Sequence, residues 1–160
     1  DLRIINLFES FYNEVLQSEK GELSEETIKQ FQIYLGTDKI SNNHLLVLLL
    51  MYQENVTQND LKDEKTKSEF QLDCIELLEK ECKDIYSKIP AIVYIYKVES
   101  LDANNKKEES YKTIIDGLKV YPNSVPLKVY SFLHTNDNVL KEDLIKNHSN
   151  HWLIKQFDIK

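Results

Sequence analysis

Apolar residues recur at intervals of three and four positions along most of this chain, and this spacing limits the fold more than any other feature. The first segment, residues 2–16, places on one face Ile4, Ile5, Phe8, Phe11, Tyr12, Val15 and Leu16. A later segment repeats the spacing at Ile75, Leu78, Cys82, Ile85 and Ile89. The period is close to the turn of an α-helix, whereas a strand would alternate every second residue. We therefore expect a set of amphipathic helices that pack against one another.

Capping residues and turns divide this pattern into about seven helices joined by short connections. Ser24 precedes Glu25 and Glu26, which is a favourable helix start because acids in the first turn stabilise the helix dipole. Gly36 suits the end of the same helix. Residues 57–69 are polar and are expected to form a loop or the exposed start of the next helix. No Gly/Ser-rich linker divides the chain, so we expect a single helical domain over residues 1–160.

Two strongly apolar segments decide between fold classes. Residues 45–52 are apolar without a break, after Ser41 as a potential cap, which predicts a central helix buried on most sides. Residues 91–98 are rich in Ile, Val and Tyr, which suits a strand, although a helix would align Tyr94 with Val98 and Leu101. The sequence thus predicts an all-α fold, either an antiparallel helix-pair bundle or a short α-solenoid. An α+β fold is the alternative if residues 91–98 form a strand.

One part of the chain resembles the tetratricopeptide repeat. The pattern Tyr111-x2-Ile114-Ile115-x-Gly117-Leu118-x2-Tyr121-Pro122-Asn123-Ser124 is similar to the second helix and closing turn of that repeat. Residues 94–103 would then form its first helix, and residues 125–134 would begin the next repeat. The resemblance covers residues 91–135. It implies stacked helix pairs whose concave face binds a peptide or another protein, and it implies no catalytic residue.

The charge of the chain bears on its partners. There are 27 acidic and 20 basic residues, a net charge of −7, and Arg3 is the only arginine. Nucleic-acid sites rely on clustered Arg and Lys, so we expect no nucleic-acid partner. Residues 1–80 carry 16 acids and 8 bases, a net charge of −8, whereas residues 81–160 carry 11 acids and 12 bases. This asymmetry fits either a solvated surface or one that steers toward a basic protein.

The longest uncharged apolar run is the eight residues 45–52, so we expect no membrane-spanning helix. The chain begins at Asp1 rather than Met, which suggests a trimmed or processed piece whose targeting segment, if any, lies upstream. Cys74 and Cys82 would lie about 12 Å apart along one helix, too far for a disulfide between them. Two free, buried thiols indicate a reducing compartment such as the cytoplasm.

Few residues suggest catalytic chemistry. His148 and His151 could reach one metal ion if both lie on a helix, which makes a metal-dependent enzyme one alternative. The sequence contains no Gly-rich phosphate loop and no Cys-x2-Cys motif. We therefore expect no catalytic residue, no cofactor and no bound metal.

Partner binding is the function that these observations favour. We expect a non-enzymatic adaptor or scaffold subunit, with an acidic inhibitor such as an immunity protein that neutralises a basic toxin as the alternative. Tyr and Trp are common at interface hot spots, and we expect Tyr96 and Trp152 to be exposed. The candidate partner-binding residues are Glu22, Glu25, Glu26, Tyr96 and Trp152.

Overall fold

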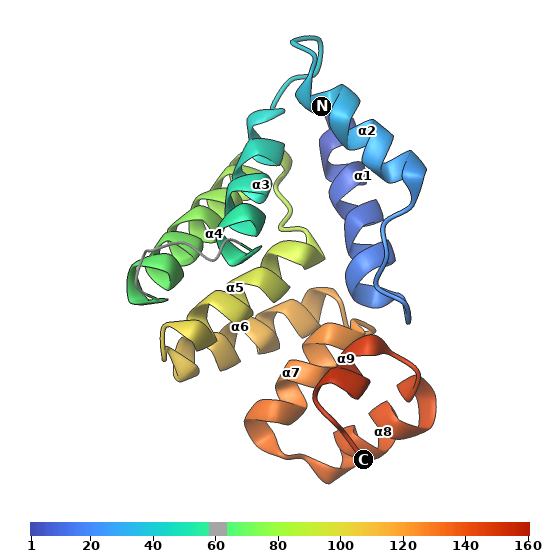
Figure 1. The fold of residues 1–160 in the computed structure, drawn as a ribbon. Helices are drawn as coiled ribbons and strands as arrows, with labels where there is room; N and C mark the ends of the chain where they lie inside the picture. Colours follow the sequence, from blue (N-terminus) through green and yellow to red (C-terminus); the bar gives the residue numbers. More distant parts are fainter. Residues whose placement is uncertain (58–63) are drawn as a thin grey trace.

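A computed structural model describes residues 1–57 and 64–160, and within these ranges the chain is helical without any strand (Figure 1). The elements are α1 (Leu2–Phe11), the π-helical turn η1 (Tyr12–Gln17), α2 (Glu25–Leu35), α3 (His44–Thr57), α4 (Glu64–Tyr86), α5 (Ala91–Ala103), α6 (Lys107–Val120), α7 (Val125–Thr135), α8 (Asn138–His148) and α9 (Trp152–Gln156). The all-α prediction is confirmed. The α+β alternative is wrong, because residues 91–98 lie within α5.

Local signals set most of the helix ends. The Ser24 hydroxyl accepts a hydrogen bond from the Thr27 amide at 3.2 Å, so Ser24 is the predicted N-cap of α2. Ser41, however, is not the cap of α3. That helix begins at His44, after a turn in which Asn42 adopts a left-handed φ of 68°. Within the polar stretch 57–69, α4 begins at Glu64, and residues 58–63 lie outside the described residues.

Helix α5 is the centre of the fold. It contacts α1, η1, α4, α6 and α7, and its buried residues are Ala91, Ile92, Val93, Ile95, Tyr96, Val98, Ser100 and Leu101. Many of these side chains are short or β-branched. Because the distance between packed helices depends on the side chains at the contact, this composition lets neighbours approach α5 from several sides.

The Leu-rich helix α3 is not the central element, so that prediction is wrong. It packs mainly against α4, and its outer face leaves Val47 45% and Met51 39% exposed. Leu45, Leu46, Leu49 and Tyr52 form its buried face. An unbroken apolar run therefore marks a helix with one buried face here, because the described elements that pack against it, mainly α4, leave its outer side uncovered.

Helices α5, α6 and α7 pack closely at Gly117. A Cβ atom at this position would lie 2.8 Å from Leu127 Cδ1 and 3.2 Å from the Tyr94 ring. Such distances are shorter than normal van der Waals contact, so only glycine fits without a shift of its neighbours. Helices α5, α6 and α7 follow one another directly in the chain.

The predicted seam of α4 is buried at Ile75, Leu78 and Cys82, but Ile85 is at the edge and partly exposed. Both cysteines are buried and unpaired, as expected. Burial, together with the negative charge of Glu81, raises the pKa of the Cys82 thiol to about 12. This thiol is therefore a packing residue and a poor nucleophile.

The C-terminal helices α7, α8 and α9 enclose a second, smaller apolar cluster that contains Val129, Leu144 and Ile154. Hydrogen bonds between residues distant in sequence join this cluster to the N-terminal segment. The Trp152 Nε1 group donates to the Val15 carbonyl at 2.9 Å, and the Trp152 amide donates to the Glu19 carbonyl at 3.1 Å. The first and last parts of the chain are thus held side by side (Figure 1).

The central position of α5 predicts unequal effects of two identical substitutions. Ile95→Ala removes a side chain that is 0% exposed, and should lower the free energy of unfolding by about 2–5 kcal/mol because it leaves a cavity. Ile33→Ala on α2 removes one that is 61% exposed, and should change it by less than about 0.5 kcal/mol. Urea unfolding followed by circular dichroism measures both. Equal losses would contradict the assignment of α5 as the core helix.

Candidate binding groove

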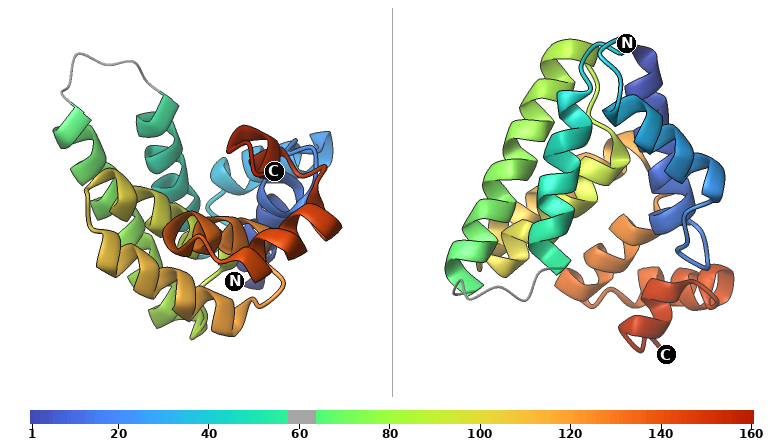
Figure 2. Two further views of the ribbon diagram at one scale, coloured as in Figure 1. Left: turned by 90° about the horizontal axis from the view of Figure 1, so that it is seen from below. Right: turned by 45° about the horizontal axis from the view of Figure 1, so that its top comes forward.

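A groove crosses one side of the molecule between α2 and α3, passes over α5, and reaches α7 and the C-terminal segment. It consists of three successive hollows of about 320, 450 and 560 Å³. Phe11, Leu23 and Gln53 line both the first and the second, and Glu99 lines both the second and the third. In the left view of Figure 2, α3 and α4 stand on one side, α1, α2 and α9 stand on the other, and α5 and α6 lie between them.

The first hollow is apolar. Its apolar lining comes from α1, the loop before α2, α2 and α3: Phe11, Leu23, Ile28, Phe31, Leu35 and Leu50. Three polar residues, Thr27, Gln32 and Gln53, complete the lining. Apolar side chains gathered in a concave surface with a polar rim are typical of sites that bind another molecule.

Glu99 lies where the second and third hollows meet. Its Oε1 accepts a hydrogen bond from the Tyr130 hydroxyl at 2.6 Å, and its Oε2 accepts one from the Tyr52 hydroxyl at 3.3 Å. Burial raises the pKa of the Glu99 carboxyl; the two tyrosine hydrogen bonds oppose this rise, and the charge of Asp102 adds to it. Burial and the charge of Glu99 also raise the pKa of both tyrosines, so their hydroxyls remain protonated donors.

Tyr96 is buried, so the prediction that it is exposed is wrong. Its ring stacks on that of Tyr52, with the centroids 4.7 Å apart, and its hydroxyl accepts a hydrogen bond from Gln53 Nε2 at 3.3 Å. Packing of its ring against Tyr52 of α3 explains this burial. Tyr96 nevertheless lines the second hollow beside Glu99, and so supports the wall of the groove.

A Ser, a His and an Asp meet at the far end of the groove. His134 Nε2 lies 3.1 Å from Asp102 Oδ1 and 3.3 Å from Ser110 Oγ. In a catalytic relay the acid and the serine must contact different ring nitrogens, because one nitrogen cannot both donate to the acid and accept from the serine. Here both contact Nε2, and Ser110 is fully buried. These three residues therefore hold α5, α6 and α7 together and do not form a nucleophilic site.

In the His148–His151 pair, both ring nitrogens of His151 are engaged in hydrogen bonds. His151 is buried, its Nε2 donates to the Leu16 carbonyl at 2.8 Å, and its Nδ1 accepts from the Leu153 amide at 3.1 Å. Burial lowers the pKa of this imidazole, and the backbone hydrogen bond to Leu16 opposes the shift in part. A metal ion would have to displace a backbone partner, so this pair does not fit the metal-site hypothesis. Among the described residues no group of three His, Cys, Asp or Glu residues could hold a metal ion.

The remaining predicted binding residues do not form one surface. Glu22, Glu25 and Glu26 are exposed around the start of α2. Trp152 is only partly buried, but its indole is occupied by the N-terminal segment, because it bonds to the Val15 carbonyl and lies against Gly21. Glu99 was missed by sequence reasoning. Its only signal is an acid between the buried residues Val98 and Ser100 of α5, close to two other charged residues, Lys97 and Asp102.

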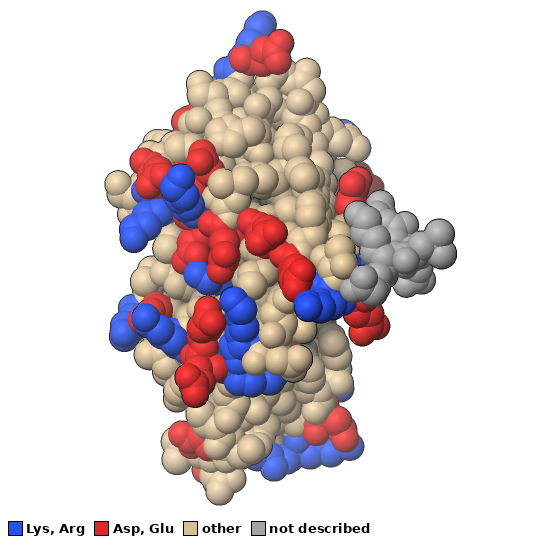
Figure 3. Space-filling view, turned by 90° about the vertical axis from the view of Figure 1, so that its left-hand side faces the viewer, with Lys and Arg blue, Asp and Glu red and all other residues tan. Residues whose placement is uncertain are grey.

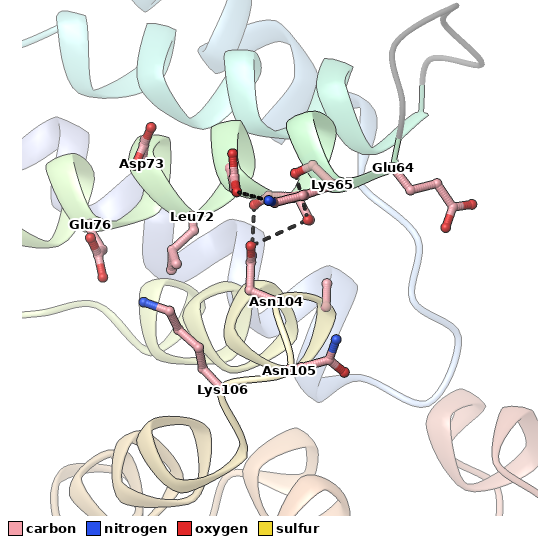
Figure 4. Close-up of a pocket in the computed structure, with 11 residues that line it drawn as sticks. Glu64, Lys65, Leu72, Asp73, Glu76, Asn104, Asn105 and Lys106 are labelled. Carbon is pink, nitrogen blue, oxygen red and sulfur yellow. Dashed lines mark hydrogen bonds and ion pairs between the residues drawn. The ribbon is translucent and has the colours of Figure 1, made fainter.

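Charged residues surround a further hollow, of about 660 Å³, between α4 and the turn after α5. Figure 4 shows Asn104 directed toward α4, where its Nδ2 donates to the Ser68 carbonyl at 2.9 Å. This hollow is lined by acids, among them Asp73 and Glu76, and by the bases Lys65 and Lys106. On this side of the molecule acidic and basic side chains are intermixed (Figure 3). The hollow thus has no single sign of charge or apolar wall to select a ligand.

No family model, curated protein or solved structure matches this chain. In the part of the chain that the structure describes, no helix is long and apolar enough to cross a bilayer. The groove and its buried carboxylate are therefore the features on which a function has to be argued.

The carboxyl of Glu99 predicts a specific pH dependence of stability. A carboxyl whose pKa is raised on folding favours the native state below its unfolded pKa, and this contribution is lost as the pH rises through the folded pKa. The free energy of unfolding of the wild type, minus that of Glu99→Gln, should therefore fall as the pH rises above the pKa of an unfolded glutamate, about 4.3. Urea titrations at several pH values measure the difference. A difference that rises with pH would contradict the buried-carboxylate assignment, and Glu22→Gln, which is exposed, serves as the control.

Proposed function

We propose that this chain is a non-enzymatic protein-binding module, an adaptor or scaffold subunit with tetratricopeptide-like helix pairs, whose groove takes up a segment of its partner. The observation that carries the proposal is the continuous groove over α5. The core helix α5 lines the second and third hollows with Tyr96, Glu99 and Asp102, and the first hollow offers mainly apolar side chains to the solvent. The hollows are present in the chain without a partner, so the groove is preformed. A preformed groove costs little ordering entropy on binding, which favours affinity.

The binding mode that fits this surface is the insertion of apolar side chains of a partner segment. A protein-binding groove of this kind uses spaced anchor residues, as an amphipathic helix or an extended segment provides. Most of the lining residues of the first hollow are Leu, Ile or Phe. Apolar anchor residues of a partner would gain binding free energy when they are buried against these side chains. We expect no nucleic-acid partner, because Arg3 is the only arginine, and we expect the protein in a reducing compartment such as the cytoplasm.

A second candidate is an acidic inhibitor, such as an immunity protein, of a basic toxin. The observation that favours it is that Glu22, Glu25 and Glu26 are exposed and take part in none of the ion pairs found among the described residues. Exposed charges steer association but are screened by salt. Binding that weakens steeply with salt, and that is lost in the triple Glu→Gln variant at these positions, would favour the inhibitor over the adaptor.

The groove proposal predicts different effects of two equally exposed positions. Ile28 on α2 lines the first hollow and is 42% exposed, whereas Val47 on α3 is 45% exposed and does not line the groove. Ile28→Arg should reduce capture of the partner from an extract of the source organism at least tenfold, because it places a charge in an apolar site. Val47→Arg should leave capture within about twofold.

The measurement is quantitative mass spectrometry of proteins retained on the immobilised chain, with circular dichroism to show that both variants are folded. A photo-crosslinking amino acid at Gln32, which also lines the first hollow, should attach to the protein that Ile28→Arg loses. Equal retention by wild type and Ile28→Arg would overturn the groove as the binding site.

A further inference from the structure

We infer that the third hollow is a cation subsite, which receives the ammonium or guanidinium group of a lysine or arginine side chain in the bound partner segment. This inference rests on the proposed function, because the cation is placed in the segment that fills the groove. It assigns the chemistry of one partner residue and the carboxylate that recognises it, Glu99.

The first reason is that no basic side chain among the described residues forms an ion pair with the Glu99 carboxyl group, and a bound cation would favour its ionised form against the effect of burial. Its two oxygens are held by the hydroxyls of Tyr130 and Tyr52, which donate hydrogen bonds but bring no positive charge. A carboxylate has about four lone-pair directions, so two hydroxyls leave room for further donors. Among the ion pairs of the described residues, none includes Glu99.

The neighbouring acid, Asp102, differs from Glu99 in having basic partners. Asp102 lines the same hollow, but Lys107 Nζ lies 3.3 Å from its Oδ1 and His134 Nε2 lies 3.1 Å from it. Lys107 and His134, which also line the hollow, are thus both paired with Asp102, whereas none of the described residues supplies a cation to Glu99. The acid in the hollow that lacks a basic partner among these residues is therefore Glu99, and its carboxyl group favours a cationic ligand over an anionic one.

The second reason is the aromatic lining. Tyr130 and Phe157 line the hollow together with Glu99, and their rings meet edge to face with centroids 6.1 Å apart. Phe157 is partly exposed, and so presents its ring to an incoming group. A cation near aromatic faces is attracted by their quadrupoles, most strongly where water is excluded. The methylene stem of Lys or Arg gains apolar contact with the same rings and with Leu133.

The third reason is position. Glu99 lies at the junction of the second and third hollows, so a cation bound there is continuous with the segment in the groove. The apolar hollow at the other end then takes apolar residues of the same segment. We therefore expect a partner motif with apolar anchors followed or preceded by one lysine or arginine, and not a free small cation.

The test uses three small probes on the full chain: the N-acetyl methylamides of lysine, arginine and norleucine. Norleucine keeps the stem of lysine but lacks the ammonium group. In ¹H–¹⁵N NMR titrations the lysine and arginine probes should shift the amides of Glu99 and Tyr130 and bind at least tenfold more tightly than the norleucine probe. Equal binding of all three probes, or no shift at these amides, would overturn the cation subsite.

Two variants separate charge from shape. Glu99→Gln should weaken the lysine probe at least tenfold without affecting the norleucine probe, and Phe157→Ala should weaken it severalfold. Phe157 lies beyond α9, so its variant provides a readout even if Glu99→Gln does not fold. Glu22→Gln, which removes an exposed acid outside the groove, should leave all three probes unchanged. Loss of lysine binding in Glu22→Gln to the same extent would overturn the assignment to Glu99.

The two proposals fail in different ways. If the lysine probe does not bind but Ile28→Arg still abolishes capture of the partner, the groove binds protein and the cation subsite is wrong. If the lysine probe binds through Glu99 while Ile28→Arg captures the partner normally, the proposed function of the groove is wrong. In that case the inference that the cation belongs to a partner segment is overturned as well.

Discussion

The burial of α5 on nearly all sides is the constraint on which the rest of this structure depends. Helices of the N-terminal, middle and C-terminal parts of the chain all pack against it. A helix in this position has almost no solvated face, so each charged residue on it needs a partner. Lys97 pairs with Glu79 at 2.5 Å, and Asp102 pairs with Lys107 and His134. Glu99 alone among these three charges faces the groove with only hydroxyl partners.

The contact between the two ends of the chain holds α1 and α2, which line the first hollow of the groove, in place. In the π-helical turn η1 the Ser18 amide bonds to the carbonyl of Asn13, five residues earlier. Carbonyls nearby, those of Val15, Leu16 and Glu19, are then bonded by groups of His151 and Trp152. π-Helical turns are rare and often occur where a helix serves a specific local purpose. Here the turn supplies acceptors that fix α1 and α2 relative to the C-terminal helices.

The helices themselves could be predicted because their apolar spacing and caps are local signals. The α2 cap at Ser24 is an example, since Ser24 and Thr27 are three residues apart. Which helix lies at the centre of the core could not be predicted from such local signals. The run 45–52 has higher apolar density than residues 91–98, yet α5 is central because its short side chains allow close approach from several directions. Periodicity reports which face is apolar, but not how many neighbours the fold will provide.

The site was predicted less well, because the sequence pattern does not report which residues the fold brings together. Burial of Tyr96 and of His151 depends on contacts with residues distant in sequence, Tyr52 and Leu16. The acid at Glu99 was visible in the sequence, but its meaning depends on which of its neighbours in the fold carry a positive charge. That information is a property of the packed structure, because the tyrosines that hold the carboxylate come from α3 and α7.

A largely buried carboxylate with no cation partner among the described residues lowers the stability of the fold, and so its presence calls for a reason. One reason would be structural, since hydrogen bonds from Tyr52 and Tyr130 fix α3 and α7 against α5. A glutamine would meet much of that need, because hydroxyls can both donate to and accept from an amide. What the carboxylate adds is attraction for a positive charge, strengthened by the surrounding low dielectric. The choice of an acid at this position is therefore explained by binding better than by folding.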